Sequence, residues 1–322
     1  MNTMIKTVDV FEVVTPDNFN EERYLQENPD IRRAVESGEL KSGWQHFKRH
    51  GQKEHRKQKT SEHRDAVLGL RKEKAARIRK ILKTDIDIEE TEDFVFDYTG
   101  TERKKMFNFD ETEKVSSFFY DAVPLEIINS LPDGLILDCG AGFRTVYYEN
   151  VVNYEIAPYL TTDVLGFAED LPFEDNSFDA VFSFAVLEHV KLPFEAAKEM
   201  VRVLKPGGKM AVCAAFLQPL HGYPHHYFNM TGQGLKVLFE DVLDIEKQFI
   251  NDGTGPISSL TWFLRQWVEG LPEREKKKFL KTKVADLLGQ PYEYLDKGYV
   301  RELSPEKQFE LASATLLLGT KR

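Results

Sequence analysis

The stretch LILDCGAG, residues 135–142, combines the pattern of a buried strand with that of a ligand-binding turn. Residues suited to a buried strand end in the acid Asp138, and Gly140 and Gly142 follow at once. Glycine has no Cβ, so the backbone of such a turn can approach a ligand closely. A fixed negative charge at the strand tip suits a cationic or hydroxyl-bearing ligand better than a pyrophosphate. We therefore expect a nucleoside cofactor over the carboxyl end of a parallel sheet.

Strands and helices that alternate along the chain are expected to position this turn. A helix is expected over residues 116–134 and another over 193–204, and a helical insertion over 256–302. The expected strands are 135–138, 150–156, 160–166, 177–186, 209–216, 242–250 and 312–322, of which the last two close the sheet. This order predicts an α/β fold with a doubly wound, mostly parallel, seven-stranded sheet in a domain that covers residues 116–322.

Residues 15–57 are expected to form a separate module of three short helices. Pro29 suits the first turn of the second helix, and Gly51 is expected to end the third. The expected core of the module consists of Tyr24, Leu25, Ile31, Trp44 and Phe47. The module resembles short helical modules that are attached to bacterial cell-envelope and glycan enzymes.

Residues 58–115 are expected to be a charged helical linker. The span 41–84 holds 15 lysines and arginines but only 4 acids, whereas residues 85–97 hold 7 acids and no base. The simplest interpretation is an exposed helix over 66–82 followed by an acidic loop. Two alternatives stay open: the basic span contacts an anionic glycan, lipid headgroup or protein, or the acidic segment folds back and neutralises it.

Composition limits the class of protein. The chain has 322 residues, of which 41% are hydrophobic and 30% charged, and its formal charge is −10, which disfavours a nucleic-acid partner. Cys139 and Cys213 do not form a CxxC pair, so a disulfide scaffold or a zinc ribbon is not expected. The sequence shows neither a signal peptide nor an apolar stretch long enough to span a membrane. We expect a cytoplasmic protein.

Five motifs, taken together, resemble those of the class I S-adenosylmethionine-dependent methyltransferases, in the branch with many small-molecule methyltransferases. They are LILDCGAG, the strand that ends at Glu155, AEDLPFEDNSFDAV, FAVLEHV and LKPGG. Each motif alone is common, but five in this order and spacing are specific. The resemblance covers about residues 116–255 and the last expected strand, and it implies a Rossmann-like fold with S-adenosylmethionine as the cofactor.

The resemblance also implies roles for individual residues. Asp138 would lie near the cofactor's ammonium group, and Gly140 and Gly142 would face its methionine end. Glu155 would accept hydrogen bonds from the ribose hydroxyls, as acids do in dinucleotide sites. Further contacts are expected with the adenine, from Phe167, Ala168, Glu169, Leu171 and Phe173, and with the methionine part, from Ser183, Phe184 and Ala185.

The chain departs from the family pattern at two places. Phe167 stands where relatives often carry an aspartate that contacts the adenine amino group. The segment between the glycine turn and the second strand is also short, so the first helix is expected to be short or missing. Arg144, in this segment, either reaches the cofactor's carboxylate or faces solvent.

The segment 216–231, FLQPLHGYPHHYFNMT, contains the candidate catalytic residues. Methyl transfer to a hydroxyl requires the oxygen to lose its proton, and a histidine near its ordinary pKa suits that role. His225 is the first choice for this base, with His221 and His226 as alternatives. His189 in the LEHV motif either lines the pocket or only hydrogen-bonds its own loop.

Two other interpretations of this segment remain open. His221 and His225 suit a metal site with Glu188 or Asp241, and an ion there would orient a diol. Alternatively, the segment is an ordered loop without chemistry. We expect no metal.

The function that the sequence favours is methyl transfer from S-adenosylmethionine to an oxygen of a sugar or related small molecule. Transfer to nitrogen or carbon of another small molecule is the second choice. A non-catalytic, methyltransferase-like scaffold in glycan assembly is the alternative from a different class.

Overall fold

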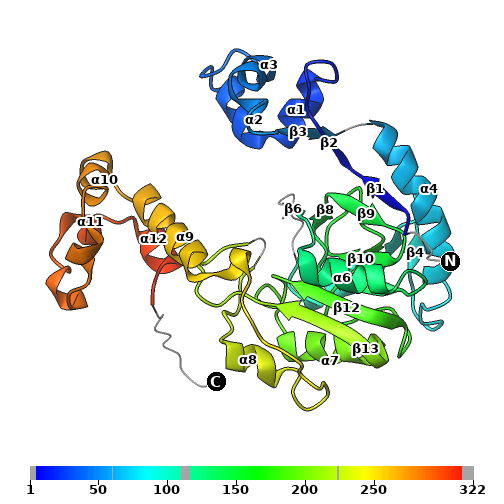
Figure 1. The fold of residues 1–322 in the computed structure, drawn as a ribbon. Helices are drawn as coiled ribbons and strands as arrows, with labels where there is room; N and C mark the ends of the chain where they lie inside the picture. The colour runs from blue at the N-terminus through cyan, green and yellow to red at the C-terminus, as the bar shows by residue number, and fades with distance from the viewer. Residues whose placement is uncertain (1–4, 60, 110–116, 223–224, 314–322) are drawn as a thin grey trace. The chain divides into compact units, whose positions relative to one another are not determined.

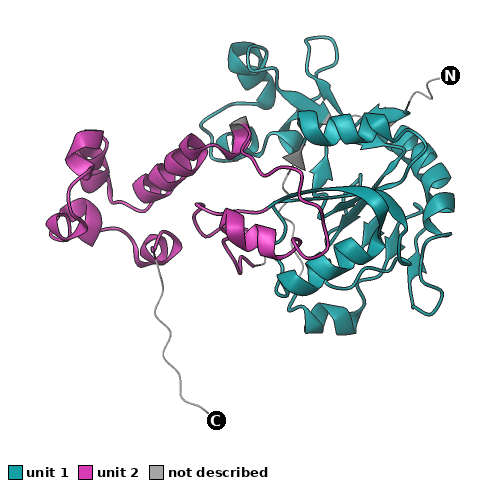
Figure 2. Cartoon of the chain, turned by 60° about the horizontal axis from the view of Figure 1, so that its bottom comes forward, with its two compact units in different colours: residues 1–213 teal, residues 214–322 magenta. Residues whose placement is uncertain are grey.

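The computed structural model describes residues 5–59, 61–109, 117–222 and 225–313. The chain divides into two compact units, residues 1–213 and residues 214–322 (Figure 2). In the described parts of the chain, no helix is both long and apolar enough to cross a membrane. The division falls directly after the last strand of the main sheet. The predicted boundaries at residues 57 and 115 stay predictions.

A seven-stranded sheet forms the centre of the first unit, in the order β13-β12-β7-β10-β11-β5-β4 (Figure 1). Neighbouring strands run parallel, except for β4 and β5 at one edge. The strands are β4 (Glu89–Glu90), β5 (Phe96–Asp97), β7 (Ile136–Cys139), β10 (Val151–Glu155), β11 (Val164–Leu165), β12 (Phe178–Phe184) and β13 (Leu204–Cys213). The doubly wound, mostly parallel, seven-stranded sheet is therefore confirmed.

The apolar central strands are covered by helices, as is typical of parallel sheets. Every residue of β7 is buried. Helix α7 (Pro193–Val203) buries Ala196, Met200 and Val203, which recur at helical spacing. Helix α6 (Ala122–Ser130) begins after Asp121, whose side chain accepts a hydrogen bond from the amide of Val123. Its residue Ile128 belongs to the main core together with strand residues.

The two edge strands come from a different part of the chain than predicted. Residues 242–250 form no strand, residues 312–313 form none either, and residues 314–322 lie outside the described part. Instead, β4 and β5 belong to the segment that was predicted to be an acidic loop, and that prediction was wrong. Two-residue strands are too short to show a period, and acids are depleted in strands, so the sequence pattern indicated a loop. Phe96 of β5 is only 2% exposed.

The first helix of the Rossmann-like pattern is missing, as the short spacing predicted. Two short strands, β8 (Phe143–Arg144) and β9 (Val146–Tyr148), occupy this part of the sequence. Strand β8 pairs with β6 (Ser117–Phe118), and β9 pairs with β1 (Thr7–Asp9). Strand β1 is therefore part of the same unit as the main sheet.

Helix α4 (Ser61–Ile78) packs on this N-terminal addition. It was predicted as an exposed helix, which is wrong for one of its faces, because Val67, Ala75 and Ile78 are completely buried. Val67 belongs to a cluster that also contains Phe143 of β8 and Tyr147 of β9. The same face buries two cations, Arg71 and Lys74. The sequence shows only a thin apolar stripe on this helix, with Val67, Leu70 and Ile78, and charged residues interrupt it, so the burial of this face was not predicted.

The three predicted helices between residues 15 and 57 are confirmed. They are α1 (Glu21–Glu27), α2 (Pro29–Glu36) and α3 (Gly43–His46), which continues into the π-helical turn η1 (Phe47–Gly51). Tyr24, Ile31 and Phe47 form the core with Val14. Strands β2 (Phe11–Val13) and β3 (Lys57–Lys59) pair at the base of this segment, which we call the helical module.

Helices make up most of the described regular structure of the second unit, which confirms the predicted helical stretch at 256–302. Leu271, Phe279 and Leu303 form its core, against which Trp267 packs. The helices are α8 (Gly232–Val237), α9 (Pro256–Glu269), α10 (Glu273–Phe279), α11 (Gly298–Arg301) and α12 (Pro305–Glu310), with short turns η2 (Asp252–Thr254), η3 (Val284–Leu287) and η4 (Pro291–Glu293).

Candidate functional site

The predicted glycine turn follows the carboxyl end of β7. Gly140 has φ = +81° and Gly142 has φ = +59°, a region that favours glycine. A Cβ on Gly140 would come within 2.2 Å of the Cγ2 of Val186, which follows β12. The turn therefore packs directly against the end of β12, and no larger side chain fits at residue 140.

Asp138, the one acid of β7, is completely buried in a network with two neighbours. Its Oδ2 accepts hydrogen bonds from the hydroxyl of Tyr120 at 2.5 Å and from Nε of Arg144 at 2.7 Å. The guanidinium of Arg144 also lies over the Tyr120 ring, 4.3 Å from its centroid. Burial, and then the charge of Asp138, raise the pKa of Tyr120 well above 10.0. Arg144 is 2% exposed, so the interpretation that it faces solvent was wrong.

Glu155 ends the neighbouring strand β10 and holds the glycine turn. Its carboxylate accepts hydrogen bonds from the backbone amides of Gly142, at 2.7 Å, and Ile156, at 2.8 Å. Asp138 pairs in register with Asn153, two residues before Glu155. Because side chains alternate between the faces of a strand, Asp138 and Glu155 belong to the same face. Burial raises the pKa of Glu155 above its ordinary value of 4.5.

The segment after β11 places Phe167 in an aromatic cluster that the sequence did not reveal. Its ring centroid lies 5.0 Å from that of Phe107 and 5.6 Å from that of Phe109. Phe107 follows α5 (Thr101–Met106), an element far away in the sequence. Ala168 is buried, and burial raises the pKa of Glu169 above 4.5. The adenine contacts expected of these residues stay predictions.

The end of β12 supplies further predicted cofactor residues. Ser183 is completely buried, Phe184 is half-buried, and Ala185 adopts φ = +55°. Leu171 and Phe173, by contrast, are fully enclosed in the core. In the LEHV motif, the backbone amide of His189 donates to the carbonyl of Val186 at 2.8 Å.

Two buried polar atoms at these strand ends fit a polar ligand. Oδ1 of Asp138 and Oγ of Ser183 have no hydrogen-bond partner among the described residues. Buried polar atoms are normally satisfied, and each exception calls for an explanation. Register pairs Asp138 with Phe182, the residue before Ser183, so both atoms belong to the carboxyl ends of adjacent strands. Together with the glycine turn, these atoms fit the nucleoside cofactor that the sequence predicts.

The three candidate histidines lie in the second unit, and hydrogen bonds distinguish two of them. Nδ1 of His221 is 2.8 Å from the carbonyl oxygen of Pro219, and the backbone amide of His221 donates to Nδ1 of His226 at 3.1 Å. Nε2 of His226 is 2.8 Å from Oδ1 of Asn229. The ring of His225 lies 5.2 Å from that of Tyr227.

These contacts assign the proton of each ring in its neutral form. A carbonyl oxygen only accepts, so Nδ1 of His221 carries the proton and Nε2 carries the lone pair. His226 has the opposite tautomer, because its Nδ1 accepts from a backbone amide and its Nε2 donates to Asn229. Burial lowers the pKa of His221 below 6.5. The neutral form of His221 is therefore favoured near pH 7.

Comparisons with known proteins agree with the site in the first unit. Residues 137–212 match the sequence model of a family described as "Methyltransferase domain". The demethylmenaquinone methyltransferase of Renibacterium salmoninarum is 51% identical over 59 residues, which are 18% of this chain and 24% of that protein. The protein of the same name from Staphylococcus carnosus is 43% identical over 82 residues, 26% of this chain and 31% of that protein. The chain thus spans about a quarter of the length of the curated relatives it matches.

Among solved structures, a methyltransferase from Thermotoga maritima described as S-adenosylmethionine-dependent, and as a possible histamine N-methyltransferase, is 25% identical. The superposition covers 36% of this chain and 67% of that chain, with a TM-score of 0.28. This TM-score is too low to show a common fold, so the fold assignment depends on the strand order and the matched motifs. Residues 137–212 thus resemble a methyltransferase domain in sequence, and they include strands β10, β11 and β12 of the doubly wound sheet.

Proposed function

We propose that the whole chain is an enzyme that transfers the methyl group of S-adenosylmethionine to a hydroxyl of a saccharide. The observation that carries the methyltransferase activity is the combination of the family match with the strand-end site at Asp138, Gly140 and Glu155. When bound, the cofactor supplies an electrophilic methyl group. The residues of this chain bind and orient it, and they remove the proton of the acceptor hydroxyl.

The saccharide is supported by the composition of the segment 216–231. Histidine, tyrosine and asparagine side chains are concentrated there, and they combine flat aromatic faces with hydrogen-bonding groups. The resemblance of the helical module to modules on glycan enzymes supports the same class of acceptor. The basic span 41–84 is proposed as a contact for an anionic surface, although part of it is neutralised by the ion pairs Arg64–Asp93 and Arg79–Glu90.

His221 and His226 are the two candidate bases whose tautomers are assigned by hydrogen bonds, and of these two the contacts favour His221. Both ring nitrogens of His226 are used inside the loop, which suits a positioning residue. Nε2 of His221 carries the lone pair, and the lowered pKa keeps this ring neutral. We propose that Nε2 of His221 accepts the hydroxyl proton as the oxygen attacks the methyl carbon.

A second candidate is methyl transfer to carbon of an apolar ring. It is favoured by the matched relatives, which are named demethylmenaquinone methyltransferases, and by exposed apolar side chains of the second unit such as Phe216, Leu217 and Phe249. The family match covers only the cofactor-binding part of this chain. The match therefore does not show that this chain uses the same acceptor as those relatives.

Calorimetry with S-adenosylhomocysteine and transfer of a tritiated methyl group test the proposal. We expect micromolar binding and radioactivity in at least one of a panel of methyl glycosides. Transfer to a naphthoquinone but to no glycoside would support the second candidate instead. A folded protein that does not bind S-adenosylhomocysteine would contradict the methyltransferase activity and support the scaffold interpretation.

A further inference from the structure

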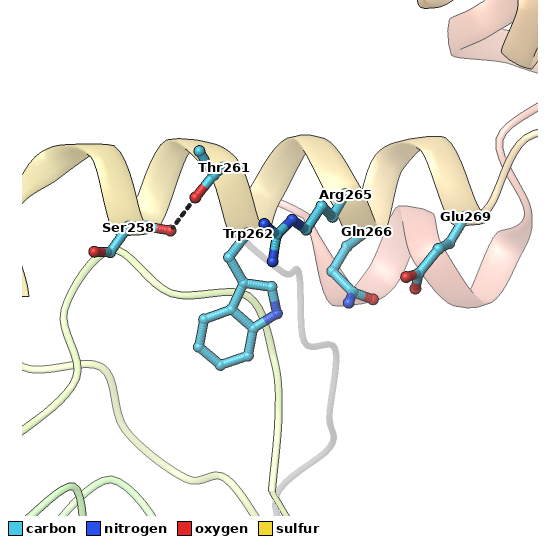
Figure 3. A pocket seen from close by; sticks show the side chains of 6 residues that line it. All are labelled: Ser258, Thr261, Trp262, Arg265, Gln266 and Glu269. Carbon is cyan, nitrogen blue, oxygen red and sulfur yellow. Dashed lines mark hydrogen bonds between the residues drawn. The ribbon is translucent and has the colours of Figure 1, made fainter. Parts of the chain in front are cut away.

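Helix α9 carries a groove on the face that does not contribute to the core of the second unit. Leu264, Trp267 and Val268 pack against the core. The groove has a volume of about 490 Å³ and is lined by Ser258, Thr261, Trp262, Arg265, Gln266 and Glu269 (Figure 3). These residues recur every three or four positions, so they form one stripe along the helix.

The aromatic part of the groove is joined to the histidine loop. The ring of Trp262 lies 4.8 Å from that of His221, which in turn lies 4.3 Å from the ring of His226. Trp262 is only half-buried, so part of its indole remains accessible. A flat, partly exposed indole beside polar groups is suited to the apolar C–H face of a pyranose ring.

Hydrogen bonds within the second unit fix what the polar groups can offer. Nζ of Lys307 donates to Oε1 of Gln266, so the amide of Gln266 has its N–H groups left as donors. The hydroxyl of Thr261 donates to the carbonyl of Ile257 at 2.8 Å, which leaves its oxygen as an acceptor. Arg265 adds donors and Glu269 adds acceptors one turn apart.

The charges in the groove balance, which selects the class of ligand. Arg265 and Glu269 carry opposite charges. Nζ of Lys307, which lies 3.9 Å from Oε2 of Glu269, is itself paired with Oε2 of Glu310 at 2.7 Å. A phosphate or another small anion would meet the carboxylate of Glu269. A neutral ligand with several hydroxyls can donate hydrogen bonds to the acceptors of the groove and accept them from its donors. Figure 3 shows Trp262, Gln266 and Glu269 on the same side of α9.

We infer that this face of α9 is the binding site for the neutral pyranose ring of the acceptor. The inference rests on the proposed function in one respect, namely that the sugar is the methyl acceptor. The claim that α9 binds a sugar does not require catalysis. The sugar ring stacks on Trp262, and its hydroxyls bond to Arg265, Gln266 and Glu269. His221, in ring contact with Trp262, is then next to the sugar.

Saturation-transfer NMR on the full chain tests the inference with methyl α-D-mannopyranoside, methyl β-D-glucopyranoside and methyl α-L-rhamnopyranoside. We expect transfer to at least one of them, loss of this transfer in Trp262→Ala, and about tenfold weaker binding in Arg265→Ala, which removes only an exposed side chain. Ile257→Ala, an exposed site on the same helix but outside the groove, is the matched control and should bind like the wild type. Circular dichroism checks that each variant is folded.

The result separates this inference from the proposed function. No transfer to any of the three glycosides, or transfer that persists in folded Arg265→Ala and Trp262→Ala, overturns the α9 site. Methyl transfer to a saccharide with an unchanged KM in both variants would also overturn it while the proposed function stands. Saccharide binding that depends on Trp262 in a protein without methyl transfer supports the site and contradicts the proposed function.

Discussion

His221 and His226 differ in what their ring nitrogens do, and this difference makes the choice of base testable. A base must be neutral, and burial lowers the pKa of His221 below 6.5. We therefore expect kcat/KM for methyl transfer to be constant near pH 7 and to fall only as the pH drops through that lowered pKa. His221→Ala should lose about 10²- to 10⁴-fold in kcat and lose this acidic limb.

His225→Ala and His50→Ala are the comparison variants for this experiment. His50 is an exposed residue of the helical module and should have no effect on the rate. A full loss of turnover in His225→Ala together with normal turnover in His221→Ala would identify His225 as the base. In His226→Ala, we expect a smaller loss, because this ring positions the loop.

Glu155 offers a residue-scale test of cofactor binding. Its carboxylate accepts two backbone hydrogen bonds at the strand tip, and the ribose hydroxyls are predicted to bond to the same group. Glu155→Gln removes the charge with little change in shape, so we expect the Kd for S-adenosylhomocysteine to rise about 10- to 100-fold by calorimetry. Glu126→Gln, an exposed site on α6, is the control. Equal affinity in Glu155→Gln and the wild type would remove Glu155 from the cofactor site.

The sequence pattern at the strand ends predicted the glycine turn and the acids beside it. It did not predict which side chains contact them. The turn is local in sequence, and its φ values follow from its glycines. The network around Asp138 joins residues 18 and 6 positions away, and the aromatic cluster at Phe167 reaches back to Phe107 and Phe109. Such contacts depend on the packing of separate elements, which a single sequence does not specify.

Among the elements, helix α4 shows why a sequence pattern can give the type of an element and miss its environment. The helix itself was predicted, but its buried face contains Lys74, whose Nζ donates to Oδ2 of Asp163 at 2.8 Å and to the carbonyl of Val151 at 2.5 Å. Nζ also lies 3.7 Å from the centroid of the Tyr147 ring. A lysine in a sequence normally indicates a solvent-exposed position. Here its charge is compensated by an aspartate 89 residues further along the chain.

Lys74→Met tests how much this buried ion pair holds α4 in place. Loss of one partner leaves the other charge buried, so we expect the free energy of unfolding at pH 7 to fall by ~3–5 kcal/mol in urea denaturation. Lys72→Met, an exposed site on the same helix, should change it by at most about 0.5 kcal/mol. A loss in Lys74→Met no larger than in Lys72→Met would show that the pair contributes nothing to stability.

The shifted pKa of Lys74 predicts that the effect of Lys74→Met on stability depends on pH. Burial lowers the pKa of Lys74 from 10.5 to about 8. Between these values, the unfolded chain binds more protons than the folded chain, so the stability contributed by this group rises with pH. The difference in stability between the wild type and Lys74→Met should therefore grow as the pH is raised from 8 towards 10. A difference that shrinks over this window would contradict the direction of the shift.

At the scale of the whole molecule, the sequence separated a methyltransferase domain beginning at residue 116 from a linker before it. In the structure, that linker supplies strands β4 and β5 at one sheet edge and helix α4 beside the other added strands. Without residues 1–115, the edge of β11 would be exposed, and Asp163 would lose the compensating charges of Lys74 and Arg71. We expect a fragment of residues 116–322 to be unfolded by circular dichroism and unable to bind S-adenosylhomocysteine.

The helical module, by contrast, should be dispensable for folding, and the sheet at its base shows how to remove it. Strands β2 and β3 are antiparallel, with Val13 opposite Lys57, so a two-residue Asn-Gly turn can join them in place of residues 14–56. The shortened chain keeps β1, α4, β4 and β5. It should therefore fold cooperatively and bind S-adenosylhomocysteine with the affinity of the full chain. If the 116–322 fragment folds and binds the cofactor, the N-terminal elements are not needed to stabilise the sheet. If the chain that lacks residues 14–56 is unfolded, the helical module is required for folding.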